Sequence, residues 1–271
     1  MSTINTNIAS LNAQRNLASS ANSLTTSMSR LSSGLRVNSA KDDAAGLAIA
    51  ERMNAQTRGM NVAIRNANDG ISMAQTAEGA LGSISNNLQR MRELAVQAAN
   101  GTNGASDIAS LNAEFTLLAA ENTRVAADTK FNGIAVIGPA PSAAPPYSFQ
   151  VGANTADVIT VTASGYTGTS ADLGPDNASA LLELDKLDVD INAITTARSN
   201  WGATQNRFDG VIANLRVASE NSAASRGRIV DADYAMETAN LSRSQVLQQA
   251  GTAMVAQANQ MPQSVLALLR Q

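Results

Sequence analysis

Residues 241–271 read LSRSQVLQQAGTAMVAQANQMPQSVLALLRQ, and their apolar side chains recur with the spacing of a helix that packs against another helix. One set recurs every seven residues: Leu247, Met254, Met261 and Leu268. A second set lies four residues after the first three of these: Gly251, Ala258 and Val265. Together they form the a and d positions of a narrow two-helix seam. The sequence therefore predicts a C-terminal helix that packs along one stripe.

This helix has little to stabilise it alone. Residues 244–269 carry no charge, and the rest of their surface is Gln, Asn, Ser and Thr. A helix is stabilised by ion pairs on its surface and by burial of its apolar face. This segment has no ion pairs, and its apolar stripe is narrow. We expect the helix to be marginal until a partner covers its seam, and the partner within the chain to be the N-terminal segment.

The N-terminal segment carries a matching apolar seam. Its members step by four and three: Leu17, Ala21, Leu24, Met28, Leu31 and Leu35. The Gly and Ser residues at 32–34 and the Asn-Ser pair at 38–39 then interrupt the pattern, which indicates a connector. Ser39 or Asp42 is the expected N-cap of the helix that follows.

Two long helical patterns fill the centre of the chain. The first runs from Ala44 to about Asn100, with a shorter helix expected over about 106–129. One face of the first carries Met60, Ile64, Ala67, Ile71, Ala74, Glu78, Leu81, Leu88 and Ala95. The second alternates steps of three and four without a slip, which is typical of a packed helix. Its members are Leu184, Leu187, Ile191, Ile194, Arg198, Trp201, Gln205, Phe208, Ile212 and Leu215. Arg198 and Gln205 either set the register or lie where the seam meets solvent.

Residues 131–176 differ from the rest. Four prolines mark a loop, and residues 147–151 and 158–162 alternate like two strands around a turn at 152–156. We expect this hairpin to be the only non-helical structure.

The order of elements predicts a mainly α protein: a long antiparallel helical coiled coil or bundle, forming a rod of two tiers with a small β-hairpin insert. The expected segments are an N-terminal helix and connector (1–43), the first half of the long-helix tier (44–130), the variable loop and hairpin (131–176), the second half of that tier (177–230), and a connector with the C-terminal helix (231–271).

Composition excludes several function classes. The 271 residues include no His and no Cys, which removes the commonest general base, metal ligand and thiol nucleophile. Asp231 and Asp233 fit capping at a connector better than a metal site. A net charge of -3 with dispersed Arg residues argues against nucleic acid. The uncharged tail is long enough to span a bilayer but holds six Gln between 244 and 269, so we expect no membrane insertion. These features predict no enzyme and no cofactor.

Motifs at both ends resemble those of bacterial flagellins. The N-terminal ones are RLSSGLRVNSAKDDAAG (30–46), RNANDGI (65–71), AEGAL (77–81) and NLQRMRELAVQ (87–97). The C-terminal ones are QNRF (205–208), DADYA (231–235), QQAGT (248–252), AQANQMP (256–262) and LALLR (266–270). The resemblance covers about 2–137 and 180–271, and the middle is too short for the large outer domains that many flagellins carry.

The resemblance implies a structural subunit that self-assembles into the flagellar filament, the extracellular propeller of motility. It implies that the terminal segments form the inner tube and are disordered in the free monomer, and that the long helices form the next shell. It also implies unfolded export through the flagellar type III pathway, with an export chaperone, a filament cap and hook-junction proteins as partners. The seams at both ends are then self-assembly residues.

Residues 88–97 resemble the stretch that host innate immune receptors bind in many flagellins. The matching positions are Gln89, Arg90, Leu94 and Glu114, whereas Leu118 stands where recognised members often carry a basic residue. The alternative interpretation makes Arg90 and Glu93 solvated residues or subunit contacts.

Two other functions stay open from the sequence. One is a surface-displayed, flagellin-like binding protein that captures a ligand through 131–176, with Tyr147 and Phe149 exposed. The other is a hook–filament junction protein, which shares the terminal helices.

Overall fold

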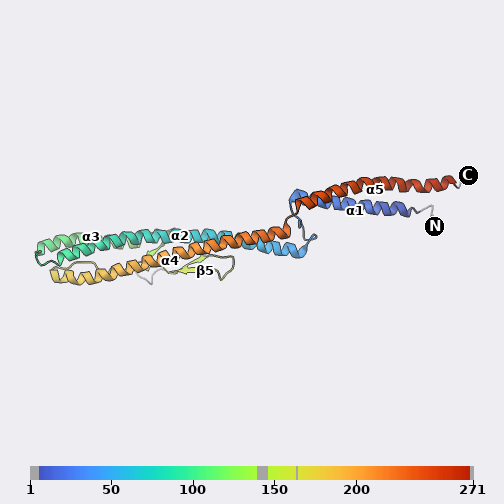
Figure 1. The fold of residues 1–271 in the computed structure, drawn as a ribbon. Helices are drawn as coiled ribbons and strands as arrows, with labels where there is room; N and C mark the ends of the chain where they lie inside the picture. Colours follow the sequence, from blue (N-terminus) through green and yellow to red (C-terminus); the bar gives the residue numbers. More distant parts are fainter. Residues whose placement is uncertain (1–5, 139–145, 163, 269–271) are drawn as a thin grey trace. The chain divides into compact units, whose positions relative to one another are not determined.

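The computed structural model describes residues 6–138, 146–162 and 164–268, with side chains described as far as residue 260 apart from 164 and 165. The chain forms two compact units (Figure 1). Unit 1 comprises Met1–Ala55 and Asn221–Gln271, and unit 2 comprises Gln56–Glu220. The boundaries between the two units fall inside long helices.

Unit 1 is built on an antiparallel pair, α1 (Ile8–Ser33) and α5 (Tyr234–Leu268). At one end of the pair the Asn7 side-chain amide donates to the carbonyl of Ala258 at 2.6 Å. At the other end the Arg30 guanidinium lies 3.9 Å from the Glu237 carboxylate. The predicted pairing of the two chain ends is confirmed.

The connectors of unit 1 meet in a small junction. Gly34 ends α1 with a left-handed φ of 72°, a conformation that costs a residue with a side chain about 1–2 kcal/mol. The chain then runs antiparallel to the end of α4 (Asn177–Val230), where Leu35 forms an isolated bridge with Asp231 and the Arg36 N–H donates to the Val230 carbonyl at 2.7 Å. Val37, Ala50 and Val230 form a small buried cluster beneath it.

The N-cap of α2 (Ala44–Ala98) is Asp43, so the predicted cap at Ser39 or Asp42 is wrong. The Asp43 carboxylate accepts the N–H of Gly46 at 2.8 Å, one of the donors that a helix leaves unpaired at its start. Asp42 accepts instead from the N–H and hydroxyl of Ser39. These bonds hold the pKa of Asp42 below its ordinary value.

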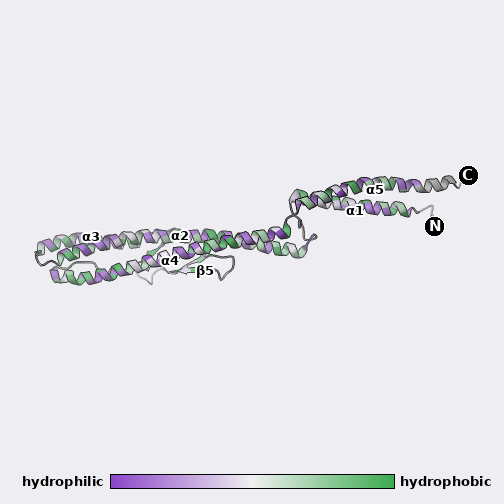
Figure 2. Cartoon of the chain, in the orientation of Figure 1, coloured by the Kyte–Doolittle hydropathy of each residue, from purple (hydrophilic) through white to green (hydrophobic). Residues whose placement is uncertain are grey.

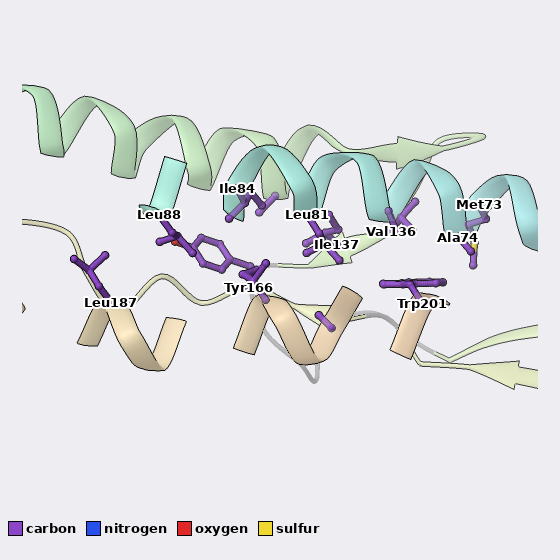
Figure 3. Packing of buried hydrophobic residues seen from close by; sticks show 14 of the residues in the cluster. Met73, Ala74, Leu81, Ile84, Leu88, Val136, Ile137, Tyr166, Leu187 and Trp201 are labelled. Carbon is purple, nitrogen blue, oxygen red and sulfur yellow. The ribbon is translucent and has the colours of Figure 1, made fainter. Parts of the chain in front are cut away.

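Unit 2 packs α2 against α4 (Asn177–Val230) in antiparallel order, with α3 (Ala105–Asp128) folded back on α2. Arg92 pairs with Asp188 at 2.7 Å, and Asn61 pairs with Ser219 at 3.3 Å further along. Leu81, Leu88, Leu187 and Trp201 are all buried between these helices (Figure 3). The predicted faces of both long helices are therefore confirmed as core.

Arg198 and Gln205 both face one carboxylate across the α2–α4 seam. Gln205 donates to Glu78 at 2.9 Å, and the half-exposed Arg198 lies 3.9 Å from the same carboxylate. Both residues lie where the seam meets solvent, and both also contact Glu78 of the opposite helix. The two interpretations, a solvent-edge position and a role in setting the register, therefore each hold in part.

The predicted hairpin exists as β4 (Tyr147–Gln150) and β5 (Val158–Val161), which pair antiparallel. It is not the only non-helical structure, so that prediction is wrong. β1 (Lys130–Phe131) pairs with β2 (Ile134–Ala135), and β3 (Ile137–Gly138) pairs in parallel with β6 (Ser164–Gly165). Asn132 and Gly133, with φ of 49° and 79°, make the tight turn between β1 and β2. Strands of two residues are too short to show an alternating pattern.

Polar side chains attach the segment between β6 and α4, residues 166–176, to the helices. The buried Asp190 accepts from the Thr169 N–H at 3.0 Å and from its hydroxyl at 2.8 Å. Asn112 accepts from the Leu173 N–H, and Asn177 donates to the Ala98 carbonyl at the end of α2. Burial raises the pKa of Tyr166, which lies on this segment, to about 12.

Gly70 provides a test of the α2–α4 contact. A Cβ at Gly70 would lie 2.7 Å from the Phe208 ring, which is itself held edge-on against Phe149 at 5.3 Å. We expect Gly70→Ala to destabilise unit 2 by about 1–3 kcal/mol, the usual cost of overpacking, despite the better helix propensity of Ala. Urea unfolding followed by circular dichroism measures it.

Gly79→Ala is the matched control, because nothing lies within 4 Å of a Cβ built there. Its gain of up to about 1 kcal/mol should raise the unfolding midpoint. Equal midpoint shifts in the two variants would show that the close approach at Gly70 has no energetic weight.

Candidate functional site

The predicted seam residues of unit 1 divide into a covered and an exposed group. Leu17, Leu24, Leu31 and Leu35 are half-buried, and Ala258 is buried. Met28, Leu247 and Met254 are exposed, at 57%, 50% and 62%. The side chains of Met261, Val265 and Leu268 lie outside the described residues.

The α1–α5 contact uses a stripe of mostly small or polar residues. On α5 the covered positions alternate in steps of four and three: Glu237, Leu241, Ser244, Gln248, Gly251, Val255 and Ala258. The corresponding positions on α1 are Ser10, Ala13, Leu17, Ser20, Leu24, Ser27 and Leu31. The sequence signal for the α5 stripe was the seven-residue recurrence of Ser244, Gly251 and Ala258, which the larger side chains beside it obscured.

Gly251 explains why α1 packs on this stripe of α5 rather than on the larger apolar residues beside it. A Cβ there would lie 3.1 Å from Leu17 Cδ1, so the missing side chain makes room for Leu17 on the surface of α5. Small residues let helix backbones approach closely, and the larger Leu247 and Met254 are then turned away from α1. The consequence is a pair in which Leu247 and Met254 stay exposed, whereas Leu17 is half-buried in the seam.

Large apolar side chains are exposed on both helices of unit 1. They are Ile8, Leu11 and Met28 on α1, and Tyr234, Met236, Val246, Leu247 and Met254 on α5. Figure 2 shows hydrophobic and hydrophilic residues interspersed along α1 and along the coloured part of α5. Contiguous apolar surface on a soluble chain marks an interaction site, whereas isolated exposed residues are ordinary. On α1 and α5 the exposed side chains accompany a seam of mostly small or polar residues, and this combination makes the helix pair the candidate site.

A polar groove of about 570 Å³ runs beside this surface. Hydroxyls from α1 line one wall, and Glu237, Arg243 and Leu247 of α5 line the other. Arg30 lies between the walls, close to Glu237. The groove places polar donors and acceptors next to the exposed Leu247, as in the polar rim of a protein interface.

The residues that resemble a receptor site lie together on α2 and α3 of unit 2. Arg90 donates to Glu114 at 2.9 Å and to Glu93 at 3.0 Å, and these hydrogen bonds raise the pKa of the guanidinium. Gln89 is exposed beside them, whereas Leu94 is buried at 1% exposure. Leu118 is half-buried against the core. The accessible part of this site is therefore the charged cluster and Gln89.

Tyr147 and Phe149 do not form an exposed binding surface. Both are half-buried, Phe149 against the ring of Phe208, and the Tyr147 hydroxyl donates to the Ala135 carbonyl. The hypothesis that residues 131–176 capture a ligand rested on exposure of these two side chains, and the structure does not show that exposure.

Among the described residues, no three His, Cys, Asp or Glu side chains gather in a way that could hold a metal ion. Over the same part of the chain, no helix has both the length and the hydropathy to cross a bilayer.

Comparison with known proteins accounts for this arrangement. The family model of the bacterial flagellin N-terminal helical region matches residues 4–137, and the model of the C-terminal helical region matches residues 184–269. This chain is a member of the bacterial flagellin family. It is thus a structural subunit of the extracellular flagellar filament, which serves motility, and not an enzyme.

Relatives match the flagellin over nearly its whole length. It is 45% identical to the flagellin of Halalkalibacterium halodurans, over 98% of this chain and 99% of that protein. It is 42% identical to the flagellin of Xenorhabdus nematophila, over 99% of both. The crystal structure of Bacillus cereus flagellin matches with a TM-score of 0.51 and 39% identity, over 56% of this chain and 88% of that one.

The α1–α5 seam predicts unequal stability along the chain. Because few large side chains are buried between α1 and α5, we expect their amide hydrogens in the monomer to exchange at least about tenfold faster than those of α2 and α4 in unit 2. Hydrogen exchange followed by mass spectrometry measures this. Equal protection in the two units would show that the small-residue seam is sufficient alone.

Proposed function

We propose that unit 1 carries the principal self-assembly contacts of the filament, and that the exposed apolar residues of α1 and α5 bind the same helices of neighbouring copies. The observation that supports it is the exposure of Met28, Leu247 and Met254 in a pair whose own seam is small and polar. Family membership implies that the chain polymerises, so a second copy is the natural partner for this surface.

The physical chemistry of the surface suits this role. Covering a Leu or Met side chain contributes about 1.5–3 kcal/mol relative to leaving it in water. Residues 244–260 of α5 carry no charge, so copies of this helix approach one another without repulsion. A contact between different patches of identical subunits propagates into a helical filament when its rotation does not close a ring.

We also propose that each segment of the chain forms a different layer of the filament. Residues 1–43 and 231–271 would form the inner tube, 44–130 and 177–230 the surrounding shell, and 131–176 the outer insert. A weakly held α1–α5 pair suits unfolded export through the type III pathway and ordering on addition at the tip. An export chaperone, the filament cap and hook-junction proteins would be its transient partners.

Leu247→Glu tests the proposed contact. We expect it to reduce elongation of seeded filaments by at least about tenfold, because a charge must then be covered at a dry contact. Sedimentation and electron microscopy of purified protein with filament fragments as seeds measure elongation.

Gln249→Glu is the matched control, since it adds the same charge at an exposed polar position of the same helix. It should elongate close to the unsubstituted rate. Equal elongation by both variants would place the assembly contact elsewhere. A chain lacking residues 241–271 should fail to polymerise while unit 2 still unfolds cooperatively.

A second function rests on the Arg90 cluster. We propose that Arg90, Gln89 and Glu114 form a surface that an innate immune receptor of the host binds, with Leu94 supporting it from beneath. The observation that favours it is an Arg that lies exposed yet fixed by two carboxylates, since fixed charges lose little freedom on binding.

Arg90→Ala should lower receptor affinity about tenfold or more, as measured by surface plasmon resonance with the receptor ectodomain. Arg124→Ala is the control, because Arg124 is equally exposed and is paired with Glu121 and Asp128 on α3 alone. Equal affinity of the two variants would leave Arg90 as a solvated residue of the helix surface.

A further inference from the structure

Among the methionine side chains that the structure describes, all but Met53 fall into two groups. Met28, Met236 and Met254 are exposed at 57%, 64% and 62%, and all three lie on α1 or α5. Met60, Met73 and Met91 are buried at 5%, 4% and 0%, and all three lie in unit 2. Met53 is half-buried. The exposed thioethers therefore lie on the two helices of the proposed assembly surface, and the inner ones are shielded in the core.

The buried group is shielded by contacts as well as by depth. Met73 and Met91 belong to the main apolar cluster between the long helices. The Met91 sulfur also accepts a hydrogen bond at 3.4 Å from the buried side-chain amide of Asn122. Peroxide reaches a sulfur only through solvent, so reaction at these positions requires unit 2 to open.

We propose that Met28, Met236 and Met254 form a modification site for peroxide oxidants, and that their oxidation in the free subunit blocks its addition to a filament. A sulfur lone pair attacks one peroxide oxygen and the O–O bond breaks; the proton on the transferred oxygen passes to the released hydroxide, which leaves as water. Sulfur is oxidised by two electrons and peroxide is reduced by two. The product is methionine sulfoxide.

The sulfoxide changes the chemistry that assembly depends on. A flexible apolar thioether becomes a polar group that accepts hydrogen bonds strongly. Covering it at an apolar contact leaves that acceptor without a partner. With no Cys in the chain, these methionines are also the sulfur atoms most open to attack among the described residues.

The inference rests on the proposed function of unit 1, because the oxidised positions must be covered on assembly. It adds an order of events. A free subunit is sensitive, whereas a subunit already in a filament is protected where its neighbours cover Met28 and Met254.

Partial oxidation of the unsubstituted monomer by hydrogen peroxide provides the test. Filament seeds are added, the filaments are sedimented, and mass spectrometry measures sulfoxide at each methionine in pellet and supernatant. We expect Met28, Met236 and Met254 to oxidise at least about tenfold faster than Met60, Met73 and Met91. The oxidised subunits should be depleted at least about fivefold from the pellet. Equal sulfoxide in pellet and supernatant at all three positions overturns the inference.

A Leu variant at all three positions separates this inference from the proposed function. Met28→Leu, Met236→Leu and Met254→Leu together keep apolar side chains of similar volume but remove the sulfur, so peroxide treatment should not change the elongation rate that this variant itself shows. If it elongates but peroxide still stops it, the inference fails while the proposed function stands. If it does not elongate, the pellet measurement on the unsubstituted chain decides alone. Failure of the proposed function is read separately, from normal elongation of Leu247→Glu.

Discussion

The close packing of Leu17 on Gly251 governs the character of unit 1. A helix has one best face for any partner, and the smallest side chains of α5 give α1 its closest approach. Choosing that face turns Leu247 and Met254 outward. In the proposed assembly, the same choice leaves few large side chains buried within the pair and leaves Leu247 and Met254 available to neighbouring copies.

Unit 2 differs from unit 1 in having a core of large apolar side chains. Its helices bury large side chains, among them Trp201, Phe208 and Leu81, and polar residues such as Asp190 and Asn122 have partners within the core. At Gly70 the core has no spare room, because the Phe208 ring occupies the place of a side chain. The flagellin thus combines a unit with a large apolar core and a helix pair, α1 and α5, whose own seam buries few large apolar side chains.

Long periodic segments could be read from the sequence, and small contacts could not. The ten-residue seam of α4 was correct because an unbroken repeat of steps of three and four leaves one helix face as the only solution. Of the predicted α5 seam, Gly251 and Ala258 lie in the contact with α1, whereas Leu247 and Met254 are exposed, since periodicity ranks side chains by hydropathy and ignores how near two backbones can come. Asp43 was passed over as a cap because three neighbouring residues, Ser39, Asp42 and Asp43, all have the chemistry for it. Only the bond to the Gly46 N–H separates them. The strands β1 and β3 are held by a tight turn and by pairing distant in sequence, neither of which leaves a repeat.

The connector junction has a consequence for the order in which the molecule folds. The hydrogen bond from the Arg36 side chain to the Ile229 carbonyl joins positions 193 residues apart. The bond between Asn61 and Ser219 already joins positions 158 residues apart within unit 2. Once that inner contact exists, only short chain segments separate the two sides of the junction, and the entropy of closing it becomes small, because each doubling of a loop adds about 0.6 kcal/mol. The long helices therefore zip first and the junction closes afterwards, so the terminal pair is the last part of the chain to acquire structure and the first to lose it.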